Sequence, residues 1–173
     1  MCYSSKTGNT KKIAEIIYEI CPFYKSIFNL EENKSTEIIN KYDLIILGYW
    51  VENSKANSLA IDFLKTVRNK NIALYGTAGT DINHPYIKSV ITKTESIIDD
   101  SNKLLGHFIC QGEIAEEVVA NFEILVNAQP ENKMLAGLLN IFKQQLPLSK
   151  GHPDKLDIQK AKEYFDKLFN SLK

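Results

Sequence analysis

A short stretch near the N-terminus, residues 4–10 with the sequence SSKTGNT, has the composition of a turn that binds an anion. It joins a short apolar segment to a helical one, so its backbone would lie at a helix N-terminus. Such a terminus carries unpaired N–H groups and a partial positive charge, which attract phosphate. Gly8 lets the backbone approach an anion closely, and the neighbouring hydroxyl groups can donate hydrogen bonds. A strand-to-helix turn with Ser and Thr caps would have the same composition, so both interpretations stay open.

Three better-known loops do not match this stretch. The chain lacks the GxxxxGK[ST] pattern of the P-loop and the GxGxxG pattern of the dinucleotide-binding turn. Cys2 begins a loop that is a little like the nucleophile loop of small tyrosine phosphatases. That loop needs an arginine six residues later, where this chain has Gly8. We therefore set a phosphatase activity aside.

Strand-like apolar runs alternate along the chain with segments of helical period, which indicates an α/β fold with a parallel sheet. Runs such as DLIILG are apolar at consecutive positions, as in a strand that is buried on both faces. Five strands are expected, at residues 1–4, 24–28, 43–48, 71–77 and 104–110. Helices are expected at residues 10–20, 56–67, 85–98, within 113–127, at 132–146 with Pro147 as its end, and at 157–172. The whole chain, residues 1–173, fits one domain.

The composition argues against several classes of protein. The 21 basic and 21 acidic residues cancel, and Arg68 is the sole arginine, so a basic surface for nucleic acid is not expected. No apolar run is long enough to cross a membrane, and the N-terminus lacks the pattern of a signal peptide. We therefore expect a cytoplasmic protein without membrane insertion.

Side chains suited to catalysis or metal binding form no recognisable pattern. Cys2, Cys21 and Cys110 are widely spaced, without a CxxC pair or a Cys/His cluster of metal-ligand spacing. A Ser/His/Asp arrangement cannot be identified either. The sequence therefore predicts no metal site and identifies no catalytic residue.

The segment YSSKTGNTKKIAEII resembles the phosphate-binding loop and first helix of the flavodoxin family, whose pattern is [ST]-x-[ST]-G-x-[ST]. Ser5, Thr7, Gly8 and Thr10 match this pattern residue by residue. LIILGYWV resembles the family's third strand and first flavin loop, and IALYGTAGT its fourth strand and second flavin loop. LLGHFICQGEI and GHPDKLDIQKAKEYF are similar to a subgroup of short bacterial flavodoxin-like domains, so the resemblance covers most of the chain.

The resemblance implies an open five-stranded parallel sheet of order 2-1-3-4-5 with helices on both faces. It also implies one FMN at the carboxyl ends of strands one, three and four, where the strand order reverses. Tyr49 or Trp50 would stack on the flavin ring, and Ala78 and Gly79 would bring backbone N–H groups to its edge. The cofactor-binding residues implied are Ser5, Lys6, Thr7, Gly8, Asn9, Thr10, Tyr49, Trp50, Val51, Thr77, Ala78, Gly79 and Thr80. One departure from the family is that only three residues precede the loop in strand one.

An FMN-dependent electron carrier is the function that these residues favour, because a carrier needs a bound flavin but no acid or base. Its expected partner is a redox protein, either a reductase or an acceptor enzyme. One alternative is an FMN enzyme that uses NAD(P)H to reduce a quinone or nitro compound, or that oxidises a porphyrinogen, with residues 113–146 covering a substrate pocket. Another is an accessory subunit of a flavin-dependent reductase. The sequence leaves the oligomeric state open.

Overall fold

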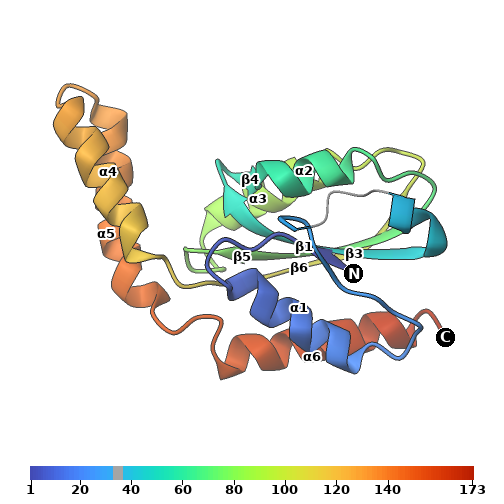
Figure 1. The fold of residues 1–173 in the computed structure, drawn as a ribbon. Coiled ribbons are helices and arrows are strands. Elements are labelled where there is room, and N and C mark those ends of the chain that lie inside the picture. The colour runs from blue at the N-terminus through green and yellow to red at the C-terminus, as the bar shows by residue number, and fades with distance from the viewer. Residues whose placement is uncertain (33–36) are drawn as a thin grey trace.

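The computed structural model describes residues 1–32 and 37–173, which form a parallel sheet between two layers of helices. Figure 1 shows α2 and α3 on one face of the sheet and α1 and α6 on the other. The strands are β1 (Cys2–Tyr3), β2 (Phe28–Asn29), β3 (Leu44–Glu52), β4 (Lys55–Ala56), β5 (Asn71–Ala78) and β6 (Lys103–Gln111). The α-helices are α1 (Asn9–Ile20), α2 (Ser58–Leu64), α3 (Pro85–Glu95), α4 (Glu116–Ala128), α5 (Lys133–Ser149) and α6 (Lys155–Asn170), and a 3₁₀ helix spans Glu37–Lys41.

The strand order is β2-β1-β3-β5-β6, with all neighbours parallel. This confirms the predicted order 2-1-3-4-5, since β5 and β6 are the fourth and fifth expected strands. A sixth strand, β4, was not expected; it pairs antiparallel with the end of β3. Within the described residues, no helix is both long enough and apolar enough to span a bilayer.

The third strand is longer than predicted. Residues 48–51 were expected to leave the sheet as a flavin loop, but they continue β3 as far as Glu52. The chain then turns through Asn53 and Ser54, both at positive φ (48° and 65°), and returns as β4. Two consecutive positive φ values are typical of the tight turn of a β-hairpin. The helix expected from residue 56 therefore begins later, at Ser58.

Two other element boundaries were predicted incorrectly. The second strand begins at Phe28 rather than at residue 24. In the segment before it, Lys25 closes the end of α1, while the carbonyl of Ser26 accepts from the Met1 amine at 2.7 Å. There, the Lys25 ammonium donates to the carbonyls of Tyr18 (2.6 Å) and Cys21 (2.7 Å). Pro147 does not end its helix but lies inside the last turn of α5. A proline removes its own N–H bond to the preceding turn and its ring crowds a carbonyl there, but this local cost falls here in the last turn of the helix.

Two tyrosines lie across two glycines at the centre of the sheet. In the β3–β5 register, Gly48 is opposite Tyr75 and Tyr49 is opposite Gly76. A Cβ at Gly48 would lie 2.1 Å from the Tyr75 ring, and a Cβ at Gly76 would lie 2.6 Å from Cζ of Tyr49. Because adjacent residues point to opposite faces, one ring fills each side of the sheet, and both are fully buried. This reciprocal packing specifies the register of the two central strands.

The Tyr49 hydroxyl belongs to a small hydrogen-bonded cluster on the α3 side of the sheet. It lies 2.7 Å from Nε2 of His107 on β6, and Nδ1 of His107 lies 3.0 Å from a carboxylate oxygen of Glu95 on α3. Burial lowers the pKa of His107, and the adjacent Glu95 carboxylate opposes that shift. Burial likewise raises the pKa of the Tyr49 hydroxyl. Both groups are therefore neutral at neutral pH and hold the strands together by a hydrogen bond.

Gly76→Ala is expected to destabilise the protein by roughly 1–3 kcal/mol, because the added methyl group would overlap the buried Tyr49 ring. Gly137→Ala on α5 is the control, since its Cβ would meet no atom within 4 Å and alanine favours helix. Urea unfolding of both variants measures the difference. Equal stabilities for the two variants would contradict the packing argument.

Stability is also expected to fall as the pH drops below about 6.5, because unfolded His107 takes up a proton there while folded His107, with its lowered pKa, does not. The contribution of His107 to the free energy of unfolding is complete above its pKa in the unfolded chain. It is lost as the pH falls toward its lower pKa in the folded protein. Urea unfolding between about pH 8 and about pH 5 should show a smaller decline for His107→Gln than for the wild type. Parallel declines in the two proteins would show that His107 does not cause the pH dependence.

Candidate cofactor site

The loop between β1 and α1 lies at the carboxyl edge of the sheet, where the strand order reverses between β1 and β3. Open α/β sheets bind ligands at such a point. Gly8 is the N-cap of α1 and has φ 92°, a conformation that side chains disfavour. No atom lies within 4 Å of the place where its Cβ would be, so the backbone conformation, not space, requires glycine here.

Backbone donors without acceptors are the main feature of this loop. The N–H groups of residues 6–10 have no hydrogen-bond acceptor within residues 1–32 and 37–173. The first turn of α1 carries no acidic side chain that could compensate the partial charge of the helix. Ser5 instead caps a later position, since its hydroxyl oxygen accepts from the N–H of Lys11 at 3.2 Å. The loop therefore has the donors and the charge that suit a phosphate group.

Hydrogen bonds join this loop to the ends of β5 and β6. Oγ1 of Thr10 lies 2.9 Å from Oγ1 of Thr77, and this contact is buried. Nδ2 of Asn9 donates to Oγ1 of Thr7 (3.1 Å) and to the carbonyl of Glu113 (2.9 Å). Because Thr7 accepts from Asn9, its own hydroxyl hydrogen is left for another acceptor. A Cβ at Gly112 would lie 3.0 Å from Nδ2 of Asn9, so glycine permits this close approach.

A second group of contacts anchors the start of the loop. The Ser4 hydroxyl donates to a carboxylate oxygen of Glu31 at 2.6 Å, and the N–H of Ser5 donates to the same oxygen at 3.0 Å. Nδ2 of Asn57 donates to Oγ of Ser4 at 2.8 Å. Oδ1 of Asn57 and Nε2 of Gln111 are buried without a partner among the described residues. Two unpaired polar atoms at the carboxyl edge are consistent with a polar ligand there.

These anchoring residues were missed in the sequence. Glu31 follows β2, Asn57 follows β4, and Gln111 ends β6. Each is a polar residue at the carboxyl end of a strand, which is a usable signal once the strands are known. Because β2 was placed too early and β4 was not expected, that signal was not available for Glu31 or Asn57.

Tyr49 and Trp50, the two residues expected to stack on the flavin ring, lie on opposite faces of β3. Tyr49 is fully buried in the core, so its ring does not line the surface of this edge. Trp50 is half-buried, and the Lys6 ammonium lies 5.7 Å from its ring centroid. Val51 pairs with Ala56 of β4. Of the two aromatic residues, Trp50 is therefore the one that lies beside the loop between β1 and α1.

Residues 77–80 also lie at this edge. Thr77 contacts Thr10, and the carbonyl of Ala78 accepts from the N–H of Gly112 at 2.8 Å. Gly79 packs against Ile114, whose Cγ1 would be 2.6 Å from an added Cβ. The Thr80 hydroxyl donates weakly to Gln145 on α5 at 3.4 Å. The loop of residues 4–10, residues 77–80 and Trp50 thus lie together at this edge. Tyr49 is the expected residue whose side chain points away from it.

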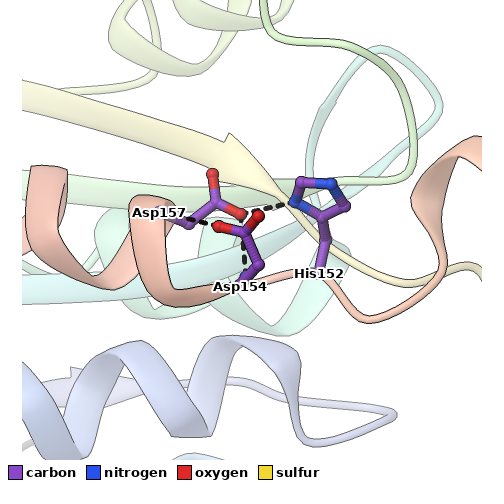
Figure 2. Close-up of side chains that lie close together, drawn as sticks. All are labelled: His152, Asp154 and Asp157. Carbon is purple, nitrogen blue, oxygen red and sulfur yellow. Dashed lines mark hydrogen bonds and ion pairs between the residues drawn. The ribbon is translucent and has the colours of Figure 1, made fainter.

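A separate cluster of His152, Asp154 and Asp157 starts α6 (Figure 2). Oδ1 of Asp154 accepts from the N–H groups of Leu156 (2.8 Å) and Asp157 (2.9 Å), and Oδ2 of Asp157 accepts from the N–H of Asp154 (2.9 Å). This is a reciprocal helix cap, and Nδ1 of His152 contacts the same oxygen of Asp157. The backbone bonds lower the pKa of Asp154. Helix capping accounts for the cluster.

Comparison with known proteins agrees with this architecture. A protein from Clostridioides difficile (strain CD3), named flavodoxin-like domain-containing protein BilS, is 39% identical over 160 residues, covering 92% of this chain and 89% of that protein. The protein of the same name from Clostridium symbiosum (strain WAL-14163) is 24% identical over 170 residues, covering 90% and 87%. Among solved structures, a Streptococcus pneumonia TIGR4 flavodoxin has a TM-score of 0.51 at 15% identity, covering 85% of this chain and 95% of that one.

The family model for the flavodoxin domain matches residues 1–166, nearly the whole chain. The strand order, the loop that precedes α1 and this match lead to the same conclusion. The chain belongs to the flavodoxin domain family.

Proposed function

We propose that this protein binds one FMN at the carboxyl edge of its sheet and transfers electrons through it. The observation that carries the proposal is the row of backbone N–H groups of residues 6–10, which have no acceptor within the described residues. A terminal phosphate would supply the acceptor that this helix N-terminus needs. Membership of the flavodoxin family supports the same ligand.

The residues at this edge fit the parts of FMN. The backbone of residues 6–10, with the Thr7 hydroxyl, would hold the phosphate, while Thr10 and Asn9 keep the loop in place. Trp50 would contact the flat ring, and residues 77–80 would lie on its other side. A bound flavin would supply the capacity to accept and release electrons one or two at a time. The chain's own residues would hold the cofactor and shield part of it from water.

An electron carrier is favoured over an enzyme because the acidic and basic side chains described near the site already make structural contacts. Glu31 already accepts from Ser4 and Ser5, and the Lys6 ammonium lies over Trp50. His84 caps α3, accepting from the N–H of Tyr86 at 3.1 Å. A redox protein partner and a cytoplasmic location, where the three buried cysteines would stay reduced, complete the proposal.

The carrier and the enzyme differ in how the protein is reduced. Purified protein loaded with FMN is expected to oxidise NADPH or NADH only when a flavodoxin reductase is added. Steady oxidation of NAD(P)H by the protein alone, with a quinone as acceptor, would favour the enzyme. Isolation without flavin, together with a stable complex with a reductase, would favour an accessory subunit.

Thr7→Val is expected to weaken FMN binding about ten- to a hundredfold, because one hydrogen bond to a charged group is worth about 1.5–3 kcal/mol. Riboflavin, which lacks the phosphate, should bind both proteins equally. Gly8→Val should act in the same direction, since φ 92° disfavours a branched side chain. Calorimetric titration of apoprotein measures both affinities, with Thr92→Val on the exposed side of α3 as the control. Equal losses for FMN and riboflavin would show that the loop does not hold the phosphate.

Trp50, the single tryptophan, is expected to lose most of its fluorescence as FMN binds, through energy and electron transfer to a nearby flavin. Trp50→Ala should weaken FMN binding by roughly 1–3 kcal/mol, the usual value of an aromatic ring stacked on a base-like ring. It should also shift the flavin potential, because stacking affects the oxidised and reduced rings differently. Trp50→Phe, which retains a ring, is the control. Unchanged Trp50 emission at saturating FMN would show that the flavin lies elsewhere.

A further inference from the structure

The helices α4 and α5 form an antiparallel hairpin that projects from the carboxyl edge of the sheet (Figure 1). The rings of Phe122 and Phe142 pack between the two helices, with centroids 4.8 Å apart, and Glu123 pairs with Lys143 at 2.7 Å. The hairpin is fixed at its base, where the N–H of Ile114 donates to Oγ of Ser149 at 3.0 Å. It is therefore an ordered part of the molecule with most of its surface in solvent.

The helix α5 is apolar over about half of its circumference, at 100° per residue. One part of this arc, around Phe142, is half-buried and faces α4. The adjacent part is exposed, and it comprises Met134 (71%), Leu138 (36%), Ile141 (54%) and Leu148 (63%). A helix that packs against one neighbour needs an apolar stripe of only about 100°. The width of the arc on α5 therefore fits two helical neighbours, and the hairpin provides one.

Exposed apolar side chains are concentrated on this hairpin. Of the nine large apolar residues that are exposed in the described chain, six lie here: Ile124, Leu125, Met134, Leu138, Ile141 and Leu148. Five of them, Leu125, Met134, Leu138, Ile141 and Leu148, can share one face of the hairpin, and we call these five the hairpin stripe; Ile124 lies about 200° around α4 from Phe122 and points away from α5. The hairpin stripe leaves on the order of 500 Å² of apolar surface open, within the range of the largest patch on a typical monomer. Two such stripes facing each other would cover on the order of 1,000 Å², about the least area that a specific protein interface needs.

The arc of α5 that carries its exposed apolar residues includes no charged side chain, so it offers nothing to attract a charged partner. The charged residues of α5, Lys133 and Lys143, lie outside its exposed arc. A neutral, apolar surface is matched best by another of the same kind, and a second copy of this chain presents one. Two-fold pairing requires a patch that is complementary to itself, which a neutral helical stripe satisfies.

We propose that the hairpin stripe is a dimer interface, in which two α4–α5 hairpins pair about a two-fold axis as a four-helix bundle. Each α5 then has its second helical neighbour, and the apolar side chains become the centre of a bundle core. The bundle stands beside the candidate cofactor site, because Gln145 of α5 contacts Thr80. The proposal is independent of FMN binding, since no residue of the hairpin stripe belongs to the site.

Sedimentation of the full chain between about 1 and about 100 µM tests the interface. The wild type should sediment as a dimer of the 19.7 kDa chain in the upper part of this range. Ile141→Glu should raise the dissociation constant at least about a hundredfold, because a charge would be buried in the bundle. Asn140→Glu is the matched control: it adds the same charge one residue away, on the exposed polar face of α5, and should remain a dimer.

Met134→Glu is a second test, because this side chain is 71% exposed and contributes little to the fold of a single chain. It should also abolish the dimer, while circular dichroism of all three variants should match that of the wild type. A wild-type monomer throughout the concentration range would overturn the proposal and leave the stripe for a different protein. A dimer that survives both Ile141→Glu and Met134→Glu, or that is lost equally in Asn140→Glu, would also overturn it.

Discussion

Backbone donors at the start of α1 impose the constraint on which the rest of the site depends. A helix leaves its first N–H groups without partners in the helix, and here the N–H groups of residues 6–10 lie at the edge of a parallel sheet without acceptors among the described residues. Neither an acidic side chain nor a side-chain N-cap compensates them. In the proposed function, a ligand with a phosphate group would resolve this imbalance. The carboxyl-edge loops, the glycine at φ 92° and the nearby tryptophan would then all serve to hold such a ligand in place.

The sheet beneath the site is built to keep these loops fixed. The paired Tyr–Gly contacts of β3 and β5 specify the register, and Thr10 and Thr77 then meet at 2.9 Å across that edge. Asn9 connects the same loop to the segment after β6. Hydrogen bonds of this kind position donors before a ligand arrives, which lowers the entropy that binding must overcome. The hairpin of α4 and α5 starts from the same edge, so the proposed dimer interface and the proposed cofactor site are both attached to the carboxyl edge of the sheet.

The fold could be predicted well from the sequence because its strands are long apolar runs and its helices are periodic. The strand order followed from the family resemblance of the loop before α1, and the structure confirms it. Local contacts decided the features that were missed. Lys25 closes α1 before β2 begins, the turn at Asn53 and Ser54 extends β3, and Pro147 is tolerated in a last helical turn.

The site was less predictable than the fold. The loop of residues 4–10 has a compact pattern, so its position at a helix N-terminus could be anticipated. Alternation along β3 could not be read before the strand was known to continue through Tyr49, which buries that ring and leaves Trp50 toward the loop. Glu31 lies 26 residues from its partner Ser5, a separation at which sequence patterns carry no information about contact.

The most direct measurement of the central claim is a ¹H–¹⁵N correlation spectrum of the apoprotein during titration with FMN and, separately, with riboflavin. FMN is expected to shift the amide signals of Lys6 to Thr10 strongly downfield and to protect them from exchange, because these N–H groups gain phosphate acceptors. Riboflavin should leave them nearly unchanged. Amides that respond equally to both flavins, or not at all to FMN, would contradict the account.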